Sequence, residues 1–358
     1  MERVGLVGLP NSGKSLLFNA LTGGNVPVAT HPFTTTETTV GVAHVPDHRL
    51  YALAKMSASR KVVEAAVEVV DIAGLVAGAD HGEGLGNRFL AGIREVDALC
   101  LVLRSFSDDE VSGERDPLAA LSVLELELVL ADVASIDAQI TKQQKAARTN
   151  PALSSSVEAM QAAHDVLQSG TPLYRSSLRQ ETRAALASLF LLTNKPVFCV
   201  VNIGEHEIAD SDAIVKSVAH ELGGHTEVLA VSVALEAEAR LLDAADRSEM
   251  LEGLGLGEGA LPRVARALYE TVGRWTFLTT GEKESRAWTF RRGAKAPECA
   301  GVIHSDLQRG FIRAEVIAWD ELLALGSWQA AKAAGKIRLE GKEYAVQDGD
   351  TLEIRFNV

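Results

Sequence analysis

The chain has 358 residues, enough for two or three domains, and its 47% of hydrophobic residues can bury a sizeable core. A net charge of −13 argues against a protein that coats nucleic acid by bulk electrostatics. No apolar run is long enough to span a membrane, no apolar leader precedes Arg3, and three widely spaced cysteines suit neither a metal site nor a disulfide framework. We therefore expect a cytoplasmic protein with reduced cysteines and no membrane partner.

The chain begins with β-rich runs that alternate with helical stretches, a pattern typical of a doubly wound α/β sheet. We expect a helix over 14–22 and buried strands over 3–7, 67–72, 98–103, 197–201 and 228–231. Each strand ends in a Gly, Asp, Asn or Ser cluster. Because ligands gather at the carboxyl ends of strands in open α/β sheets, these clusters predict one shared site.

A complete G-x-x-x-x-G-K-S motif occupies residues 8–15, between an expected strand and an expected helix. Its glycines let backbone N–H groups face phosphates, and the helix N-terminus adds its positive end. We expect Lys14 to bridge the β- and γ-phosphates of a nucleoside triphosphate and the Ser15 hydroxyl to bind Mg²⁺. The flanking strand and helix disfavour the alternative, a chance glycine-rich turn. The nucleotide-binding residues expected here are Pro10, Asn11, Ser12, Gly13, Lys14, Ser15 and Leu16. Asn11 is also a candidate ligand for K⁺.

Two further segments are expected to complete the phosphate and Mg²⁺ site. Asp71-Ile72-Ala73-Gly74 closes the strand over 67–72, so Asp71 would hold the metal and the Gly74 N–H would face the γ-phosphate. A D-x-x-G sequence by itself is more often an ordinary turn. The phosphate-binding motif at residues 8–15 favours the metal-binding interpretation here. The threonine-rich run 32–36 suits a switch segment that the γ-phosphate orders, with Thr35 as the expected Mg²⁺ ligand.

Leu75 stands just after D-x-x-G, where Ras-like enzymes carry the Gln that orients the attacking water. A leucine side chain has no group for that task. Hydrolysis would then need a bound cation, a residue from a mobile loop or a group from a partner. The expected catalytic residues are Lys14, Thr35, Gly74 and Leu75.

Base recognition is expected from Asn202-Ile203-Gly204-Glu205, which stands where GTPases of this architecture carry N-K-x-D. Ile203 replaces the Lys, and Glu205 replaces the Asp with a carboxylate that reaches one methylene farther. Both changes weaken the expected selectivity for guanine and allow adenine. Ser232, after the strand over 228–231, would close the base pocket. Without the phosphate-binding motif upstream, a plain strand-to-loop turn would be the better interpretation.

An insertion separates the strands over 98–103 and 197–201. Helical spacing over 116–148 and 154–168 predicts a hairpin of two helices packed as a coiled coil, although a rigid spacer would give the same pattern. After residue 274 the strand-like runs 287–290, 311–317 and 352–356 predict a compact α+β module. The expected domains are therefore 1–117 with 190–274, a helical arm over 118–189, and 275–358.

The acidic excess is unevenly distributed along the chain. Residues 275–358 carry 12 basic and 12 acidic side chains, and residues 138–183 carry 6 basic and 3 acidic ones. Any contact with a polyanion such as RNA is therefore expected to be local, weak and sensitive to salt, through the arm or the C-terminal module.

These motifs together resemble the YchF family, the Obg-like ATPases among the translation-factor P-loop GTPases. The resemblance rests on Gly8–Ser15, Pro32–Thr35, Asp71–Leu75, Gly82–Asn87, Asn202–Glu205, Arg286–Thr289, Gly310–Val316, Gly341–Tyr344 and Arg355–Val358. It implies a P-loop G domain, an inserted coiled-coil arm and a C-terminal TGS domain, which is a β-grasp fold. It also implies a preference for ATP over GTP, ribosome association, and a hydrophobic residue in place of the catalytic Gln, here Leu75.

Two other functions stay open at this point. The protein could be an Obg-type GTPase of ribosome assembly, in which guanine is the base. It could also be a nucleotide-gated scaffold with negligible turnover, since Leu75 removes the usual water-orienting group.

Overall fold

A computed structural model describes residues 2–24, 38–72, 85–108, 111–150, 153–254 and 256–357. The chain divides into two compact units. The first contains Met1–Val42 and Glu68–Leu268, and the second contains Ala43–Val67 and Tyr269–Val358. Among the described helices, none is both long enough and apolar enough to cross a membrane.

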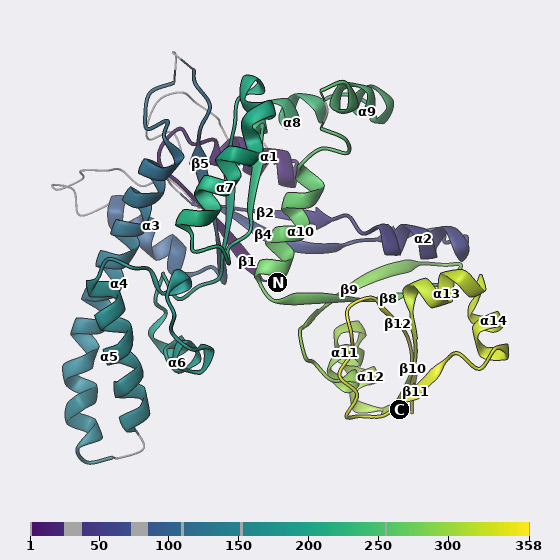
Figure 1. Cartoon of the computed structure of the whole chain (residues 1–358). Helices are drawn as coiled ribbons and strands as arrows, with labels where there is room; N and C mark the ends of the chain where they lie inside the picture. The colour runs from purple at the N-terminus through teal and green to yellow at the C-terminus, as the bar shows by residue number, and fades with distance from the viewer. Residues whose placement is uncertain are drawn as a thin grey trace. The chain divides into compact units, whose positions relative to one another are not determined.

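A six-stranded sheet organises the first unit, in the order β2-β4-β1-β5-β6-β7 (Figure 1). Its strands are β1 Arg3–Val7, β2 Thr39–Val45, β4 Ala65–Asp71, β5 Ala98–Arg104, β6 Val197–Asn202 and β7 Val228–Val231. The run from β4 to β7 is parallel throughout. All residues of β5 are buried, as expected for the middle of a sheet with helices on both faces. The expected doubly wound α/β architecture is confirmed.

Outside the insertion, the helices of the first unit are α1 Lys14–Thr22, α3 Leu85–Arg94, α7 Ser211–Glu221, α8 Val233–Ala239, α9 Ala244–Gly253 and α10 Leu261–Thr271. One apolar cluster joins β5 to α3, to α7 and to the first turns of the helix α4 (Pro117–Ala147). It includes Leu101, Phe89, Val218 and Leu124. Burial of these side chains stabilises the sheet, and the sheet in turn brings the ends of its strands to one edge.

A pair of long helices, α4 Pro117–Ala147 and α5 Ser154–Gln168, lies side by side in Figure 1. Asp116 caps α4 by accepting the Leu118 N–H, and Pro117 suits the first helical turn. The pair shares an apolar cluster that includes Ile136, Met160 and Ala163. The short helices η2 Leu173–Arg175, α6 Gln180–Ala185 and η3 Ala187–Leu189 lead back to the sheet.

Two buried carboxylates of α4 hold this return segment. Asp132 accepts hydrogen bonds from the Leu192 N–H at 2.8 Å and from the Thr193 N–H at 2.8 Å and hydroxyl at 2.7 Å. Glu125 accepts a hydrogen bond from the Tyr174 hydroxyl at 2.8 Å and pairs with Arg175 at 3.0 Å. Burial of a carboxylate costs free energy unless hydrogen bonds or an ion pair compensate for it. These contacts therefore fix the position of α4 relative to the return segment.

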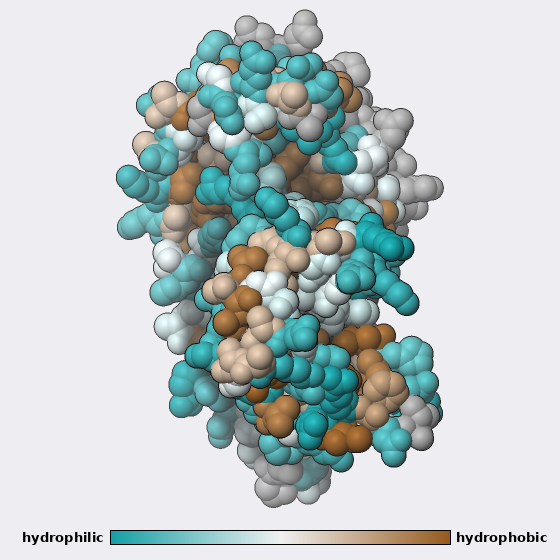
Figure 2. All heavy atoms as spheres, turned by 90° about the vertical axis from the view of Figure 1, so that its right-hand side faces the viewer, coloured by the Kyte–Doolittle hydropathy of each residue, from teal (hydrophilic) through white to brown (hydrophobic). Residues whose placement is uncertain are grey.

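A second mixed sheet, in the order β11-β10-β12-β8-β9-β3, organises the second unit. Its strands are β3 Val62–Val63, β8 Arg274–Thr279, β9 Ser285–Arg291, β10 Phe311–Ala318, β11 Arg338–Glu340 and β12 Asp350–Phe356. Its helices are α2 His48–Met56, α11 Ala296–Ile303, α12 Ser305–Arg309, α13 Trp319–Leu325 and α14 Trp328–Ala333. Phe277 and Phe290 pack with Cys299 of α11 in its core. On the face in Figure 2, small hydrophobic patches are separated by hydrophilic side chains.

The segment 43–67 belongs to this second unit, although it lies early in the chain. Within it, α2 buries Leu50, Leu53 and Ala54, and β3 pairs in parallel with β9. Backbone bonds extend the pairing, since the Arg60 N–H donates to Glu282 and the Ser285 N–H donates to Lys61. Sequence reasoning missed β2, α2, β3, β8 and β11. The Asp47 cap and the apolar spacing of α2 were readable signals, but the partners of this segment lie more than 200 positions away.

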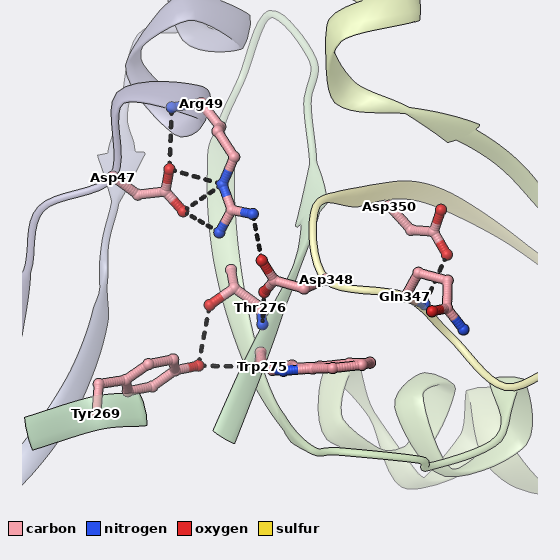
Figure 3. Close-up of polar contacts among 8 residues, drawn as sticks. All are labelled: Asp47, Arg49, Tyr269, Trp275, Thr276, Gln347, Asp348 and Asp350. Carbon is pink, nitrogen blue, oxygen red and sulfur yellow. Dashed lines mark hydrogen bonds and ion pairs between the residues drawn. The ribbon is translucent and has the colours of Figure 1, made fainter. Parts of the chain in front are cut away.

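A partly buried arginine ties α2 to the last part of the chain (Figure 3). Arg49 donates through Nε and Nη2 to the Asp47 carboxylate at 2.8–3.1 Å, and through Nη1 to Asp348. The other Asp348 oxygen accepts the Thr276 N–H at 2.8 Å. Burial acts to raise the pKa of Asp47, but the bonds from Arg49 outweigh it and hold that pKa below its ordinary value.

We expect Arg49→Met to lower the free energy of unfolding by about 2 kcal/mol, because two carboxylates lose the cation between them while Asp348 keeps partial access to solvent. The depressed pKa of Asp47 stabilises the fold above about pH 4, and this contribution is lost as pH falls through the folded-state pKa. The difference from the wild type should therefore be largest near pH 7 and shrink in acid.

Chemical denaturation at several pH values measures this effect. Lys295→Met removes an exposed ion pair with Glu343 in the same unit and serves as the control. An equal loss in both variants, or a difference between Arg49→Met and wild type that does not change with pH, would contradict the role assigned to Arg49.

Candidate nucleotide-binding site

Parallel pairing brings polar residues to one edge of the first sheet. The register aligns Leu6 of β1 with Asp71 of β4, and Arg104 of β5 with Asn202 of β6. Asn202 is in turn aligned with Val231 of β7, just before Ser232. The carboxyl ends of five strands thus surround the loop at residues 8–13, which connects β1 to α1.

Close approaches on both sides of this loop require glycine. A Cβ on Gly13 would lie 2.2 Å from the Asn202 side-chain nitrogen, and Gly13 has a φ of +94°, where only glycine is unstrained. A Cβ on Gly8 would lie 2.4 Å from the Val102 carbonyl oxygen. The loop therefore fits tightly between strand ends, with α1 starting at Lys14.

Lys14 is buried, and its ammonium group donates to the Gly8 and Leu9 carbonyls, each at 2.9 Å. Burial lowers the pKa of Lys14 to about 8, with partial compensation from the nearby Asp71 charge. The loop thus encloses an ammonium group at the N-terminus of a helix, a combination that can bind phosphate.

Ser15 and Asp71 form a pair of oxygen groups beside Lys14. The Ser15 hydroxyl donates to Asp71 Oδ2 at 2.7 Å, and Asp71 is 1% exposed. Burial raises the pKa of Asp71, although Ser15 and Lys14 act in the opposite direction. Among the described residues, no donor satisfies the other carboxylate oxygen, Oδ1. A hydroxyl and an incompletely bonded buried carboxylate make a donor set suited to a hard cation such as Mg²⁺.

Asn202 clamps the loop from the neighbouring strand. Its side-chain amide donates to the Ser12 carbonyl at 3.1 Å, and its side-chain oxygen accepts the Val233 N–H at 3.2 Å. It therefore joins the phosphate-binding loop to the segment that follows Ser232. One side chain orients two candidate binding segments at once.

Comparisons with known proteins agree with this geometry. The family described as 50S ribosome-binding GTPase matches residues 3–131, and the YchF GTPase C-terminal family, described as a protein of unknown function, matches residues 275–357. The ribosome-binding ATPase YchF of Bacillus subtilis is 44% identical over 99% of both chains, and that of Haemophilus influenzae is 42% identical over 99% of both. The chain belongs to the YchF family.

Solved structures extend the likeness to the fold. The YchF GTPase of Schizosaccharomyces pombe has a TM-score of 0.86 at 31% identity, with 99% of this chain and 97% of that chain covered. A GTP-binding protein of Pyrococcus horikoshii, at 20% identity and a TM-score of 0.59 over both whole chains, shares the fold. The expected combination of a P-loop G domain with a YchF-type C-terminal domain is confirmed.

For the other expected site residues of this YchF-family chain, the structure gives the location and exposure. Glu205 is exposed at the start of η4 Glu205–Asp210, whereas Ile203 is buried in the apolar cluster of the sheet. Ser232 is buried at the N-cap of α8. Pro10, Asn11 and Leu16 are partly exposed, and Ser12 is buried. Thr35, Gly74 and Leu75 lie outside the described residues, so their roles stay predictions.

Sequence reasoning missed two supporting residues at this edge of the sheet. Glu207 accepts hydrogen bonds from the Gly204 N–H at 2.7 Å and the Ser105 hydroxyl at 2.6 Å, and so fixes the turn after β6. Arg104 is buried at the end of β5 and donates to the Ser112 carbonyl at 3.1 Å. A charged residue that closes a wholly apolar strand was the only signal available for Arg104.

We expect Asn202→Ala to weaken ATP binding about tenfold, because the Ser12 carbonyl and the Val233 N–H lose their shared partner and the loop is held less firmly. Calorimetric titration measures this loss. Asn194→Ala is a matched control, since Asn194 bonds only structurally to Arg183 in the return segment. Unchanged affinity in Asn202→Ala would show that the loop keeps its shape without this clamp.

Proposed function

We propose that this protein is a ribosome-associated P-loop ATPase that acts as a nucleotide-dependent switch. It hydrolyses ATP, and GTP less well, to ADP and phosphate. The observation that carries the proposal is the enclosure of Lys14 and the Ser15–Asp71 pair at the strand ends beside Asn202. The names of the Bacillus and Haemophilus relatives, ribosome-binding ATPases, support the choice of nucleotide and partner.

The triphosphate is held by the loop from Pro10 to Leu16. In the nucleotide-bound state, Lys14 exchanges the Gly8 and Leu9 carbonyls for phosphate oxygens. Ser15, Asp71 and Thr35 would hold Mg²⁺, which would neutralise phosphate charge. The incompletely bonded Asp71 carboxylate beside the Ser15 hydroxyl fits such an ion. Asn11 is the proposed ligand for K⁺.

We propose that the segment after β6 reads the base, with Asn202 orienting this segment and Glu205 and Ser232 as the groups that contact the base. Ile203 is buried in the apolar cluster of the sheet. Glu205 carries its carboxylate one methylene farther than the Asp of N-K-x-D, which weakens the paired hydrogen bonds that guanine requires. The pocket therefore favours adenine.

Water activation does not use a glutamine, because Leu75 occupies that position. Gly74 offers its N–H to the γ-phosphate, while Lys14 and Thr35 stabilise the charge that develops there. Without a side chain to orient the attacking water, turnover is slow, and it suits a switch that a partner accelerates.

We propose three domains, of which the first is interrupted by the second. Residues 1–117 and 190–274 form the G domain in sequence, although the segment 43–67 belongs to the second compact unit. Residues 118–189 form the helical arm and 275–358 the TGS domain. The arm and the TGS domain give a weak RNA contact within the ribosome complex, which is consistent with the local balance of charge in those segments. The proposed location is the cytoplasm.

The nucleotide preference is tested by calorimetric competition between ATP and GTP. We expect tighter binding of ATP, and we expect Glu205→Asp to shift the preference toward GTP because the shorter carboxylate restores the guanine-binding distance. Glu207→Asp, at an adjacent structural carboxylate, is the control for a general effect on this turn. A clear preference of the wild type for GTP would favour the Obg-type GTPase instead.

Turnover is tested by multiple-turnover phosphate release with and without ribosomes. We expect slow release that ribosomes stimulate, and we expect Lys14→Ala to abolish it, because Lys14 is the buried ammonium group of the phosphate loop. If the wild type releases no more phosphate than Lys14→Ala under either condition, the protein is a nucleotide-gated scaffold.

A further inference from the structure

Arg104 carries a buried charge that none of the described acidic residues neutralises through an ion pair. It is the last residue of β5 and is 1% exposed. Its guanidinium donates through Nε to the Phe106 carbonyl at 3.1 Å, through Nη1 to Ser112 at 3.1 Å and through Nη2 to Val111 at 3.0 Å. It also lies 4.4 Å from the centre of the Phe106 ring. Burial of a charge costs free energy unless hydrogen bonds compensate for it. These bonds to three carbonyl groups therefore indicate that Arg104 holds the segment containing Phe106, Val111 and Ser112 in place.

The Ser112 carbonyl connects this arginine to the phosphate-binding loop. It accepts hydrogen bonds from Arg104 Nη1 and from Asn11 Nδ2, both at 3.1 Å. The next residue, Gly113, has a φ of +118°, and a Cβ there would lie 3.5 Å from the Pro10 carbonyl oxygen. Residues 112–113 thus lie directly against Pro10 and Asn11.

At the end of the neighbouring strand β6, Asn202 also holds a residue of the phosphate-binding loop. Arg104 and Asn202 are register partners at the ends of β5 and β6. Asn202 bonds to the Ser12 carbonyl directly, whereas Arg104 reaches Asn11 through Ser112. Two adjacent strand ends therefore hold two successive residues of the loop.

We propose that Arg104 is a positioning residue that orients the Asn11 carboxamide through the shared Ser112 carbonyl, and so sets the affinity of the loop for a nucleoside triphosphate. This inference rests on the proposed nucleotide-binding function. Asn11 has a φ of +63°, a left-handed conformation that asparagine adopts more readily than most residues, and its bond to the Ser112 carbonyl holds the carboxamide in place. The planar fork of arginine can donate to three diverging carbonyls, whereas lysine presents one compact ammonium group.

A double-mutant cycle tests the route through Asn11 in the full-length protein. Arg104→Met, Asn11→Ala and the double variant are compared for ATP affinity by calorimetry and for kcat and KM. We expect Arg104→Met to weaken ATP binding about tenfold in the wild-type background and less than about twofold when Asn11 is already Ala. We expect Arg104→Lys to recover only part of the affinity, because it cannot occupy all three carbonyls.

Arg115→Met is the matched control, since Arg115 is exposed and lies in the same segment. It donates to the Ser107 hydroxyl and to the Asp108 carbonyl, which Arg104 also contacts at 3.5 Å. We expect its ATP affinity to equal that of the wild type. Thermal unfolding without nucleotide separates lost affinity from lost folding. If Arg104→Met does not fold, Arg104→Lys carries the same cycle.

Unchanged affinity in the folded Arg104 variants, or effects that add fully to those of Asn11→Ala, would overturn the proposal. An equal loss in Arg115→Met would also overturn it, because the effect would then belong to the whole segment. Failure of the proposed function looks different: the wild type itself would bind neither ATP nor GTP.

Discussion

Parallel pairing of β4, β1, β5 and β6 is the constraint on which the candidate site depends. Parallel strands that run side by side end at the same edge, so residues far apart in sequence meet there. The bond from Asn202 to Ser12 joins residues 190 positions apart, and the bond from Ser15 to Asp71 joins residues 56 positions apart. Neither contact would form if a strand shifted by one residue, because every side chain would then face the opposite side of the sheet.

Contacts from neighbouring side chains fix the backbone conformation of the phosphate-binding loop. The loop takes part of its shape from its neighbours, since Gly8 and Gly13 lie close to Val102 and Asn202. Asn202 fixes it from one strand end, and Lys14 closes it from within. The backbone of the loop is thus held by its neighbours without a ligand, and such preorganisation would reduce the entropy lost on binding.

Much of this organisation could be predicted because the signals were local. The helices over 14–22 and 154–168 have the expected bounds, since their apolar spacing and end residues lie within the segments themselves. The P-loop and Asp71 were readable for the same reason. The segment 43–67 was not, because the apolar face of α2 is buried by partners that sequence spacing does not reveal. Arg104 was missed since a single charged residue after a strand predicts no particular contact. Thr35, Gly74 and Leu75 stay predictions.

The early position of α2 has a consequence for the synthesis of the protein. Arg49 and its partner Asp348 are 299 positions apart, so this part of the second unit cannot close until almost the whole chain has been made. During that time the apolar face of Leu50 and Leu53 has no native surface to cover it. Contacts of such long range fold slowly, and they leave apolar surface open to wrong partners. A nascent chain of this topology therefore places a particular demand on chaperones that hold an early segment until the last strands emerge.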